Sequence, residues 1–467
     1  MTTIADPTAG RLEASSYESL KKKHLSDVRS NLPKYMERLR WPREKIAAEQ
    51  QQRLRSLVAF AKENSMWHSE RLAGFDPSRL TLDDLSSLPT MTKSDLMSNF
   101  DAIVTDKRLN LKLVNAHVSA LTKDSYLLDE FHAVSSGGSS GRRGVFVYGW
   151  DSWLICFLGA RSSFLIASRP EYAGSVAAGV SAEHASHLST AIAHTFGASI
   201  NVHHFPVTDP IEKIVSGLNE LKPVRLVSYP SMLYLLALEA QAGRLRIAPK
   251  IVSSSAEPLT PRVKKVVLDA WHVPVLNIWG ASEGGFLAWS CGKGKGMHVN
   301  EDLFIIEPVD RRGSPVPAGT RSSKIYFTNL FNTTLPLIRY EITDEVTFLS
   351  EEDGACDCGC NFQRVDDIRG RLEDNFFYPN GIAIHPSAFW SILEEEPNIL
   401  EYQVRQTHGG ALIIIHFSGD VRIESLRQKI TLELEKHGLS HPDVEIREVD
   451  KIDRTVAGKF KKFVPLN

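Results

Sequence analysis

The chain has 467 residues, of which 42% are hydrophobic and 24% are charged, and its formal net charge is −2. This length allows two or three domains and a large core, and the near-neutral charge gives no basic footprint for a nucleic-acid partner. No apolar run approaches the roughly 20 residues that cross a bilayer, and residues 1–10 lack the charged-then-apolar pattern of a secretory signal. We therefore expect a cytoplasmic protein with neither a nucleic-acid nor a membrane partner.

The first predicted helices lie in the polar-rich residues 15–70, which carry apolar side chains at helical spacing. A further helix is expected to begin at Lys93, within Leu88-Pro89-Thr90-Met91-Thr92-Lys93-Ser94-Asp95-Leu96. Thr92 suits its N-cap and Asp95 its first turn.

Residues 134–144 contain four glycines, four serines and two arginines between two strand-like runs. Glycine permits positive φ, so successive backbone N–H groups can converge on an anion, and the serine and arginine side chains add donors that suit phosphate. A flexible Gly/Ser linker is the alternative. The flanking strands and the arginines favour a phosphate loop.

Strand-like and helical segments then alternate. Residues 151–167 read as a helix, 226–231 as a strand followed by a helix over 232–240, and 251–254 and 273–279 as strands on either side of a helix that contains Val263 and Val267. This order predicts a mostly parallel α/β sheet. Ligands bind such sheets at the carboxyl ends of the strands, where the polar loops 255–258 and 280–285 fall.

The pattern of predicted elements changes near Gly370. Strands at 323–330 and 337–344 precede it, whereas strands at 412–417 and 444–449 and an amphipathic helix from Ile423 follow it. We predict a large domain over residues 1–370 and a small α+β domain over residues 371–467.

Six motifs in order resemble those of adenylate-forming enzymes, the acyl-CoA synthetase superfamily, and are most similar to the phenylacetate–CoA ligase branch. They are the glycine loop, SSAEP (254–258), GASEGG (280–285), PLIRYEITDEV (336–346), IRGRLED (368–374) and RTVAGKF (454–460). The likeness covers most of residues 80–467. It implies a large adenylation domain and a small C-terminal domain that is mobile.

The resemblance also implies roles for individual residues. Glu283 matches a Mg²⁺ carboxylate, Arg371 an arginine near ribose and phosphate, and Lys459 a lysine that reaches the α-phosphate during adenylation. Asp344 matches the carboxylate that accepts both ribose hydroxyls, and Glu373 stands at the hinge. The predicted nucleotide-binding residues are Ser135, Ser136, Gly137, Gly138, Ser139, Ser140, Gly141, Ser255, Ala256, Glu257, Pro258, Trp279, Gly280, Ser282 and Asp344. Taken singly, Asp344 is more often a turn residue and Arg371 part of a surface ion pair, whereas Glu283 and Lys459 are more often solvated charges.

The chain departs from the family pattern at three places. Ser139-Ser140 and Arg142-Arg143 replace a threonine pair and a proline or lysine, Ile342-Thr343 replaces Thr-Gly, and Glu373 replaces the usual hinge aspartate. Each change retains the functional group that the chemistry requires.

The resemblance implies activation of a carboxylic acid by ATP with Mg²⁺, release of pyrophosphate and transfer of the acyl group to coenzyme A. One alternative passes the acyl group to an amine or a carrier-protein thiol, and another is a catalytically silent nucleotide-binding protein. We expect a small aromatic acid, because Tyr229 and Trp279 can stack on a ring and Gly284 and Gly285 leave room for one. The predicted substrate pocket comprises His187, His203, Tyr229, Trp279, Gly284, Gly285 and Phe286. The family likeness favours a homodimer.

Three of the five cysteines occur in Cys356-Asp357-Cys358-Gly359-Cys360. Cys356 and Cys358, together with Cys291 and His298, offer three thiols and an imidazole, a ligand set suited to tetrahedral Zn²⁺. The alternative is an isolated thiol and a surface turn. Some phenylacetate–CoA ligase relatives look similar here, and that likeness makes Cys360 the spare. We predict one structural zinc bound by Cys291, His298, Cys356 and Cys358.

Overall fold

The computed structural model describes residues 9–136, 144–197, 201–368, 370–454 and 460–466. Its N-terminal part is helical, as predicted: α1 (Ala9–Glu37), α2 (Arg43–Asn64), α3 (Met66–Arg71), α4 (Lys93–Ser98), α5 (Phe100–Ile103) and α6 (Leu111–Ala120). The predicted cap of α4 is confirmed, because the Thr92 hydroxyl accepts the Asp95 N–H and the Asp95 carboxylate accepts the Thr92 N–H. Among the described residues, no helix combines the length and apolarity needed to span a bilayer.

An eight-stranded sheet forms the centre of the large domain, with strand order β13-β9-β8-β7-β6-β5-β3-β4. Its strands are β3 (Ala177–Ser181), β4 (Val202–Pro206), β5 (Arg225–Ser228), β6 (Ile251–Ser255), β7 (Val275–Ala281), β8 (Gly285–Trp289), β9 (Met297–Val299) and β13 (Arg364–Val365). Strands β3 to β7 pair in parallel, and β7, β8, β9 and β13 pair antiparallel. The direction changes between β7 and β8, at the segment GASEGG.

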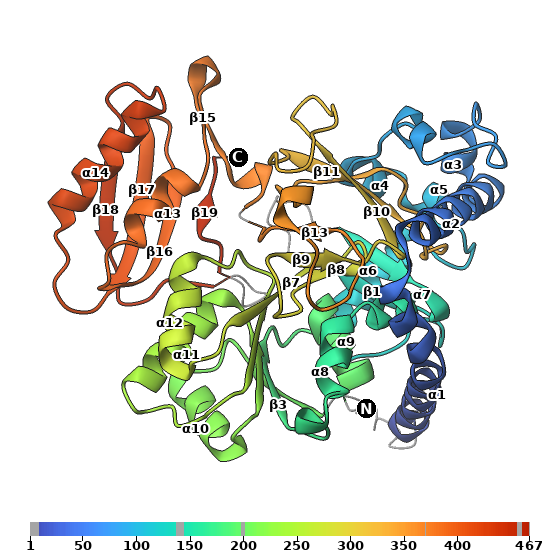
Figure 1. Ribbon diagram of the computed structural model, residues 1–467, viewed down its shortest axis with the longest axis horizontal. Helices are drawn as coiled ribbons and strands as arrows, with labels where there is room; N and C mark the ends of the chain where they lie inside the picture. Colours follow the sequence, from blue (N-terminus) through green and yellow to red (C-terminus); the bar gives the residue numbers. More distant parts are fainter. Residues whose placement is uncertain (1–8, 137–143, 198–200, 369, 455–459, 467) are drawn as a thin grey trace, which may run out of the picture.

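Helices cover both faces of this sheet (Figure 1). On one side lie α10 (Ile211–Leu221), α11 (Pro230–Gln241) and α12 (Pro261–Trp271), and on the other lie α8 (Arg161–Ala167) and α9 (Leu188–Phe196). The helix predicted over 151–167 is two helices, α7 (Trp150–Leu158) and α8, with a break at Gly159-Ala160. The Asn300 side chain donates to the Gly159 carbonyl at 3.0 Å and so competes for an acceptor that a continuous helix would use.

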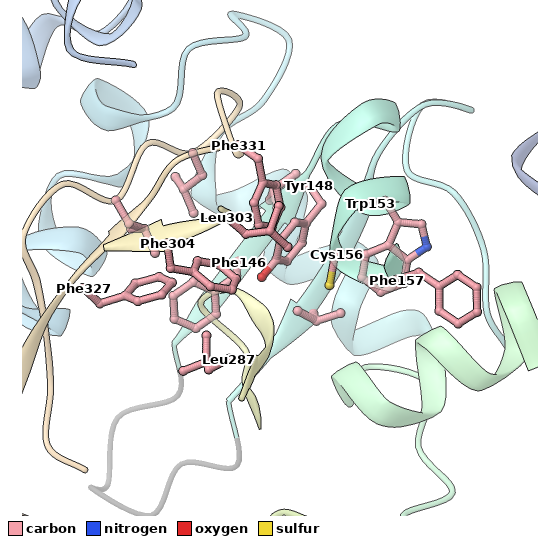
Figure 2. Close-up of a cluster of buried hydrophobic side chains, with 14 of the residues drawn as sticks. Phe146, Tyr148, Trp153, Cys156, Phe157, Leu287, Leu303, Phe304, Phe327 and Phe331 are labelled. Carbon is pink, nitrogen blue, oxygen red and sulfur yellow. The ribbon is translucent and has the colours of Figure 1, made fainter. Parts of the chain in front are cut away.

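Two smaller antiparallel sheets complete the large domain. The hairpin of β1 (His132–Ser135) and β2 (Val145–Tyr148) flanks the glycine loop. The other sheet contains β10 (Phe304–Val309), β11 (Lys324–Asn329) and β12 (Tyr340–Ile342). Side chains from β2, α7, β8, β10 and β11 pack into one buried cluster (Figure 2).

The C-terminal part contains β14 (Phe376–Phe377), β15 (Ala383–Ile384), α13 (Ser387–Leu393), β16 (Ile399–Gln406), β17 (Gly410–Phe417), α14 (Ile423–Lys436), β18 (Asp443–Glu448) and β19 (Phe463–Val464). Its four-stranded sheet has the order β18-β17-β16-β19, and its own hydrophobic core is formed by side chains between Phe376 and Phe463. The predicted fold class is confirmed. The sequence analysis identified β17, α14 and β18 but missed α13 and β16. The boundary at residue 370 stays a prediction.

Candidate active site

A pocket lies at the carboxyl ends of strands β5 to β7, between the two domains. The predicted nucleotide-binding residues in its wall are Ser136, Ala256, Glu257, Pro258, Trp279, Gly280, Ser282 and Asp344, and Glu283, Arg371 and Glu373 line it as well. The small domain contributes Pro386, Trp390, Phe460, Lys461, Lys462 and Phe463. Ser135 and Ser255 precede wall residues without lining the pocket themselves. Gly137, Gly138, Ser139, Ser140, Gly141 and Lys459 lie outside the described residues.

Asp344 is a buried carboxylate of the pocket and is 3% exposed. The Trp279 indole Nε1 donates to its Oδ2 at 2.7 Å, and Arg371 Nε donates to its Oδ1 at 2.8 Å. Each carboxylate oxygen accepts one hydrogen bond from the protein and keeps a second lone pair. The side chain is therefore fixed in orientation and still able to accept two hydroxyl groups.

Glu283 lies in the turn between β7 and β8. Burial raises the pKa of its carboxyl, and the nearby cations Lys93 and Arg371 oppose that rise. The turn is held on both sides, since Asn329 Nδ2 donates to the Glu283 carbonyl at 3.0 Å and the Tyr148 hydroxyl to the Ser282 carbonyl at 2.6 Å. A partly desolvated carboxylate on a fixed turn is suited to hold a divalent cation.

The two glycines of this turn do not provide space for a substrate, contrary to the expectation from the sequence. A Cβ on Gly284 would lie 2.6 Å from Phe327 Cζ and 2.8 Å from Phe304 Cε1, and a Cβ on Gly285 would lie 2.3 Å from Cys156 Sγ. Figure 2 shows these aromatic rings and this thiol inside the buried cluster. The glycines are required because the protein core packs directly against the turn.

The segment 255–258 follows β6 with a strained backbone. Ala256 has φ +70°, a conformation that costs free energy for a residue other than glycine and is concentrated at functional sites. Its neighbour Glu257 uses both carboxylate oxygens. Oε2 accepts the Ser231 N–H and Oε1 accepts the Phe460 N–H, each at 3.0 Å. Glu257 thus links the large domain to the end of the chain.

The start of the glycine loop is hydrogen-bonded to its exit and to the connection between β3 and α9. Ser136 and Gly144 exchange two hydrogen bonds, from Ser136 N–H to the Gly144 carbonyl and from Gly144 N–H to the Ser136 hydroxyl, both at 2.9 Å. The Ser135 N–H donates to the Ser186 carbonyl at 2.8 Å. The two ends of the loop are therefore fixed beside the pocket.

Most of the predicted substrate wall lies elsewhere. His203 is exposed on β4 at the edge of the sheet, and the buried Tyr229 hydroxyl accepts the Ala182 N–H at 3.0 Å. His187 precedes α9 and Phe286 lies on β8. Of the predicted wall residues, all of which the structure describes, Trp279 alone lines the pocket between the domains.

A second constellation lies at the far end of β8. The four predicted ligands, Cys291, His298, Cys356 and Cys358, are together, with all four ligand atoms within 4.8 Å of one another. Cys291 Sγ is 3.4 Å from Cys356 Sγ, and Cys358 Sγ is 3.2 Å from His298 Nε2. Ligand sulfurs of tetrahedral zinc are separated by about 3.7 Å, given Zn–S bonds of about 2.3 Å. The predicted clustering is confirmed.

The surroundings of this cluster also suit a metal. The Lys293 N–H donates to Cys291 Sγ and the Cys360 N–H to Cys358 Sγ, both at 3.4 Å, and such contacts stabilise thiolates. His298 Nδ1 is 3.3 Å from the Phe362 carbonyl, which leaves Nε2 as the free ligand atom. Cys360 is buried against apolar side chains outside the ligand set, as expected for the spare thiol.

Comparison with known proteins finds relatives along most of the chain. The chain is 28% identical over 393 residues to the phenylacetate-coenzyme A ligase of Thermus thermophilus, which covers 79% of this chain and 80% of that protein. The protein of the same name from Escherichia coli is 26% identical over 427 residues, covering 85% and 88%. The chain therefore resembles the phenylacetate-coenzyme A ligases. It is also 22% identical to Protein CapK of Staphylococcus aureus, over 89% of this chain and 88% of that protein, and no family model matches it.

Solved structures share the fold of this chain. A 2-hydroxyisobutyryl-CoA ligase in the postadenylation state matches it with a TM-score of 0.71 at 22% identity, covering 91% of this chain and 90% of that one. The same enzyme in the thioesterification state gives a TM-score of 0.60 at 20% identity, covering 91% of each chain.

The structure adds pocket residues that the sequence analysis did not assign. Lys93 begins α4 and lines the pocket, and its Cε lies 3.0 Å from where a side chain on Gly144 would begin. Burial lowers the pKa of Lys93, while Glu283 and Glu373 oppose that shift. In the sequence analysis, Lys93 appears as the first residue of a predicted helix and has no assigned role in the site. Trp390 belongs to α13, which was not predicted.

Proposed function

We propose that this phenylacetate–CoA ligase-like chain activates a carboxylic acid with ATP and transfers the acyl group to coenzyme A. The observation that carries the proposal is a single pocket that is lined by Glu283, Asp344 and Arg371 and also by Lys461 and Lys462 of the small domain. The names of the relatives support an acid and coenzyme A as substrates. The acyl-adenylate in the similar solved structures supports the route.

The two steps balance without a protein nucleophile. A carboxylate oxygen of the acid attacks the α-phosphorus of ATP while the bond to pyrophosphate breaks. The thiol of coenzyme A then loses its proton to solvent, its sulfur attacks the acyl carbon, and the bond to AMP breaks. Both steps require alignment and charge neutralisation above all.

The described residues can meet these requirements. Asp344, oriented by Trp279 and Arg371, accepts the ribose hydroxyls, and the guanidinium of Arg371 adds positive charge that suits phosphate. Glu283 would hold Mg²⁺, which neutralises phosphate charge when bound. Lys93 adds a cation at the exit of the glycine loop. We further propose that Lys459, next in sequence to Phe460, enters the same pocket during adenylation.

The higher TM-score against the postadenylation state supports a domain arrangement that accompanies the first step. For the second step the small domain would rotate about Leu372–Glu373. We also propose that the cysteine–histidine cluster binds one structural zinc. The ion would have all its positions filled by protein ligands and would link the loops around Cys291 and Cys356.

The test is acid-dependent pyrophosphate release across a panel of aryl, arylacetic and short alkyl acids, with a Glu283→Gln variant as the matched control. We expect one class of acid to support release and to yield an acyl-CoA that mass spectrometry identifies. Release without acyl-CoA, with an amide formed when amines are supplied, would favour an amide synthetase. ATP binding without release for any acid would favour the silent nucleotide-binding alternative.

A further inference from the structure

Arg262 joins the two domains through several contacts of one guanidinium. It lies in the first turn of α12, and its Cζ is 4.8 Å from the centre of the Tyr234 ring, whose hydroxyl also accepts from Arg262 Nη2. Tyr234 is buried in the large domain. The guanidinium is therefore positioned by its own domain before it contacts the other.

The same guanidinium reaches three backbone carbonyls of the small domain. Nη1 is 3.5 Å from the Leu393 carbonyl, and Nη2 is 3.2 Å from the Pro397 carbonyl and 2.5 Å from the Ile399 carbonyl. These carbonyls belong to the end of α13 and the start of β16. A single cation thus holds the connection between two core elements of the small domain.

Two further contacts join the same surfaces. Glu257 accepts the Phe460 N–H at 3.0 Å, and Arg454 Nη1 donates to the Ser231 hydroxyl at 3.2 Å while its Nη2 pairs with Glu401 at 2.8 Å. Ser231, Glu257 and Phe460 line the pocket between the domains, and Phe460 follows Lys459 directly in the sequence.

We infer that Arg262, together with Glu257, is a positioning latch that holds the small domain in the arrangement used for adenylation. The inference rests on the proposed function and extends it to two residues that act through the small domain. Rotation of that domain for thioester formation breaks the Arg262 and Phe460 contacts together. Weakening the latch therefore slows the first half-reaction and leaves the second intact.

The experiment compares wild-type protein with Arg262→Ala. Lys265→Ala is the control, since Lys265 is exposed on the same helix and pairs with Asp269 at 2.6 Å within it. Pyrophosphate–ATP exchange measures adenylation with an acid that the wild type accepts. Conversion of supplied acyl-adenylate and coenzyme A measures the second half-reaction. Small-angle scattering of the three ligand-free proteins measures the domain arrangement without reference to activity.

We expect Arg262→Ala to lower the exchange rate about tenfold, as for loss of hydrogen bonds from a charged group, with thioester formation unchanged and a larger radius of gyration. Lys265→Ala should match wild type in all three measurements. An equal fall in both half-reactions, or scattering curves that coincide for all three proteins, would overturn the latch. If the wild type adenylates no acid, the proposed function fails, and the scattering comparison still decides whether Arg262 fixes the domains.

Discussion

The pocket between the domains and the cysteine–histidine cluster lie at opposite ends of strand β8 but are built in different ways. The cluster takes four ligand atoms from two short segments and keeps them within 4.8 Å of one another. The pocket takes side chains from both domains, and its charged groups come from segments that are far apart in the sequence. The cluster is therefore specified by residue type, whereas the pocket depends on how distant elements and two domains are arranged. Changes in the first should affect stability, and changes in the second should affect chemistry.

The largest expected effect is on the chemistry in the pocket. Lys459→Ala should abolish formation of the acyl-adenylate, by a factor of hundreds, because loss of an aligned charge on the transition state costs about 3–4 kcal/mol. Thioester formation from supplied acyl-adenylate and the melting temperature should stay near wild type. Lys461→Ala and Lys462→Ala are the matched controls. Equal losses in all three variants would mean that the lysines act through general electrostatics.

Changes in the cysteine–histidine cluster should instead affect metal content and stability. Cys358→Ser should lose a bound metal and lower the melting temperature by several degrees, because a structural site contributes its binding free energy to folding. Protein purified without added zinc should contain about one zinc per chain by elemental analysis. Cys360→Ser should keep the metal, since its thiol lies outside the ligand set. Metal-free wild-type protein of full stability would refute the zinc proposal.

The Asp344→Ala variant tests whether a change in the pocket weakens ligand binding without affecting folding. Asp344→Ala should weaken ATP binding about tenfold or more in calorimetry, because two hydrogen bonds to a charged acceptor are lost. The control is Trp279→Phe, which removes the indole donor and leaves the carboxylate and Arg371 in place. That variant should bind ATP more tightly than Asp344→Ala. Equal affinity of wild type and Asp344→Ala would remove this carboxylate from the nucleotide site.

The smallest expected effect is on stability, and it comes from Asp374, which also lines the pocket. Burial, together with the neighbouring Glu373, raises the pKa of Asp374 to about 6 from an ordinary 3.8, although Arg371 and Lys461 oppose the shift. Between these pH values the folded state binds more protons than the unfolded state, so this group's contribution to stability improves as the pH falls and is unfavourable above pH 6. Asp374→Asn should therefore stabilise the protein at pH 8 by on the order of 1 kcal/mol.

That gain should shrink as the pH is lowered through 6 towards 4, which melting curves at several pH values would measure. Asp420→Asn is the control, because Asp420 is an exposed aspartate of the same domain. It should leave the melting temperature unchanged at every pH. A lower melting temperature of Asp374→Asn at pH 8 would show that the Asp374 carboxylate stabilises the fold.

The sequence predicted features that depend on local chemistry. The cap of α4 follows from Thr92 and Asp95, three residues apart, and the cluster follows from its thiols and imidazole. The sequence could not predict features that depend on packing between residues far apart in the chain. The rings of Phe304 and Phe327 fill the space beside Gly284, and the glycine pattern alone does not distinguish a filled space from an open one. The contact of Glu257 with Phe460 joins residues 203 positions apart, and only the folded arrangement of two domains brings them together.

The reversal of chain direction between β7 and β8 limits how the chain can vary in length. Five parallel strands meet an antiparallel hairpin here, and the turn is closed by a hydrogen bond from the Gly284 N–H to the Ala281 carbonyl at 3.2 Å. An inserted residue would shift Gly285 away from Cys156 and reverse the side-chain alternation of β8. Natural insertions and deletions among relatives should therefore avoid residues 281–285. They should accumulate instead in exposed connections such as residues 311–321.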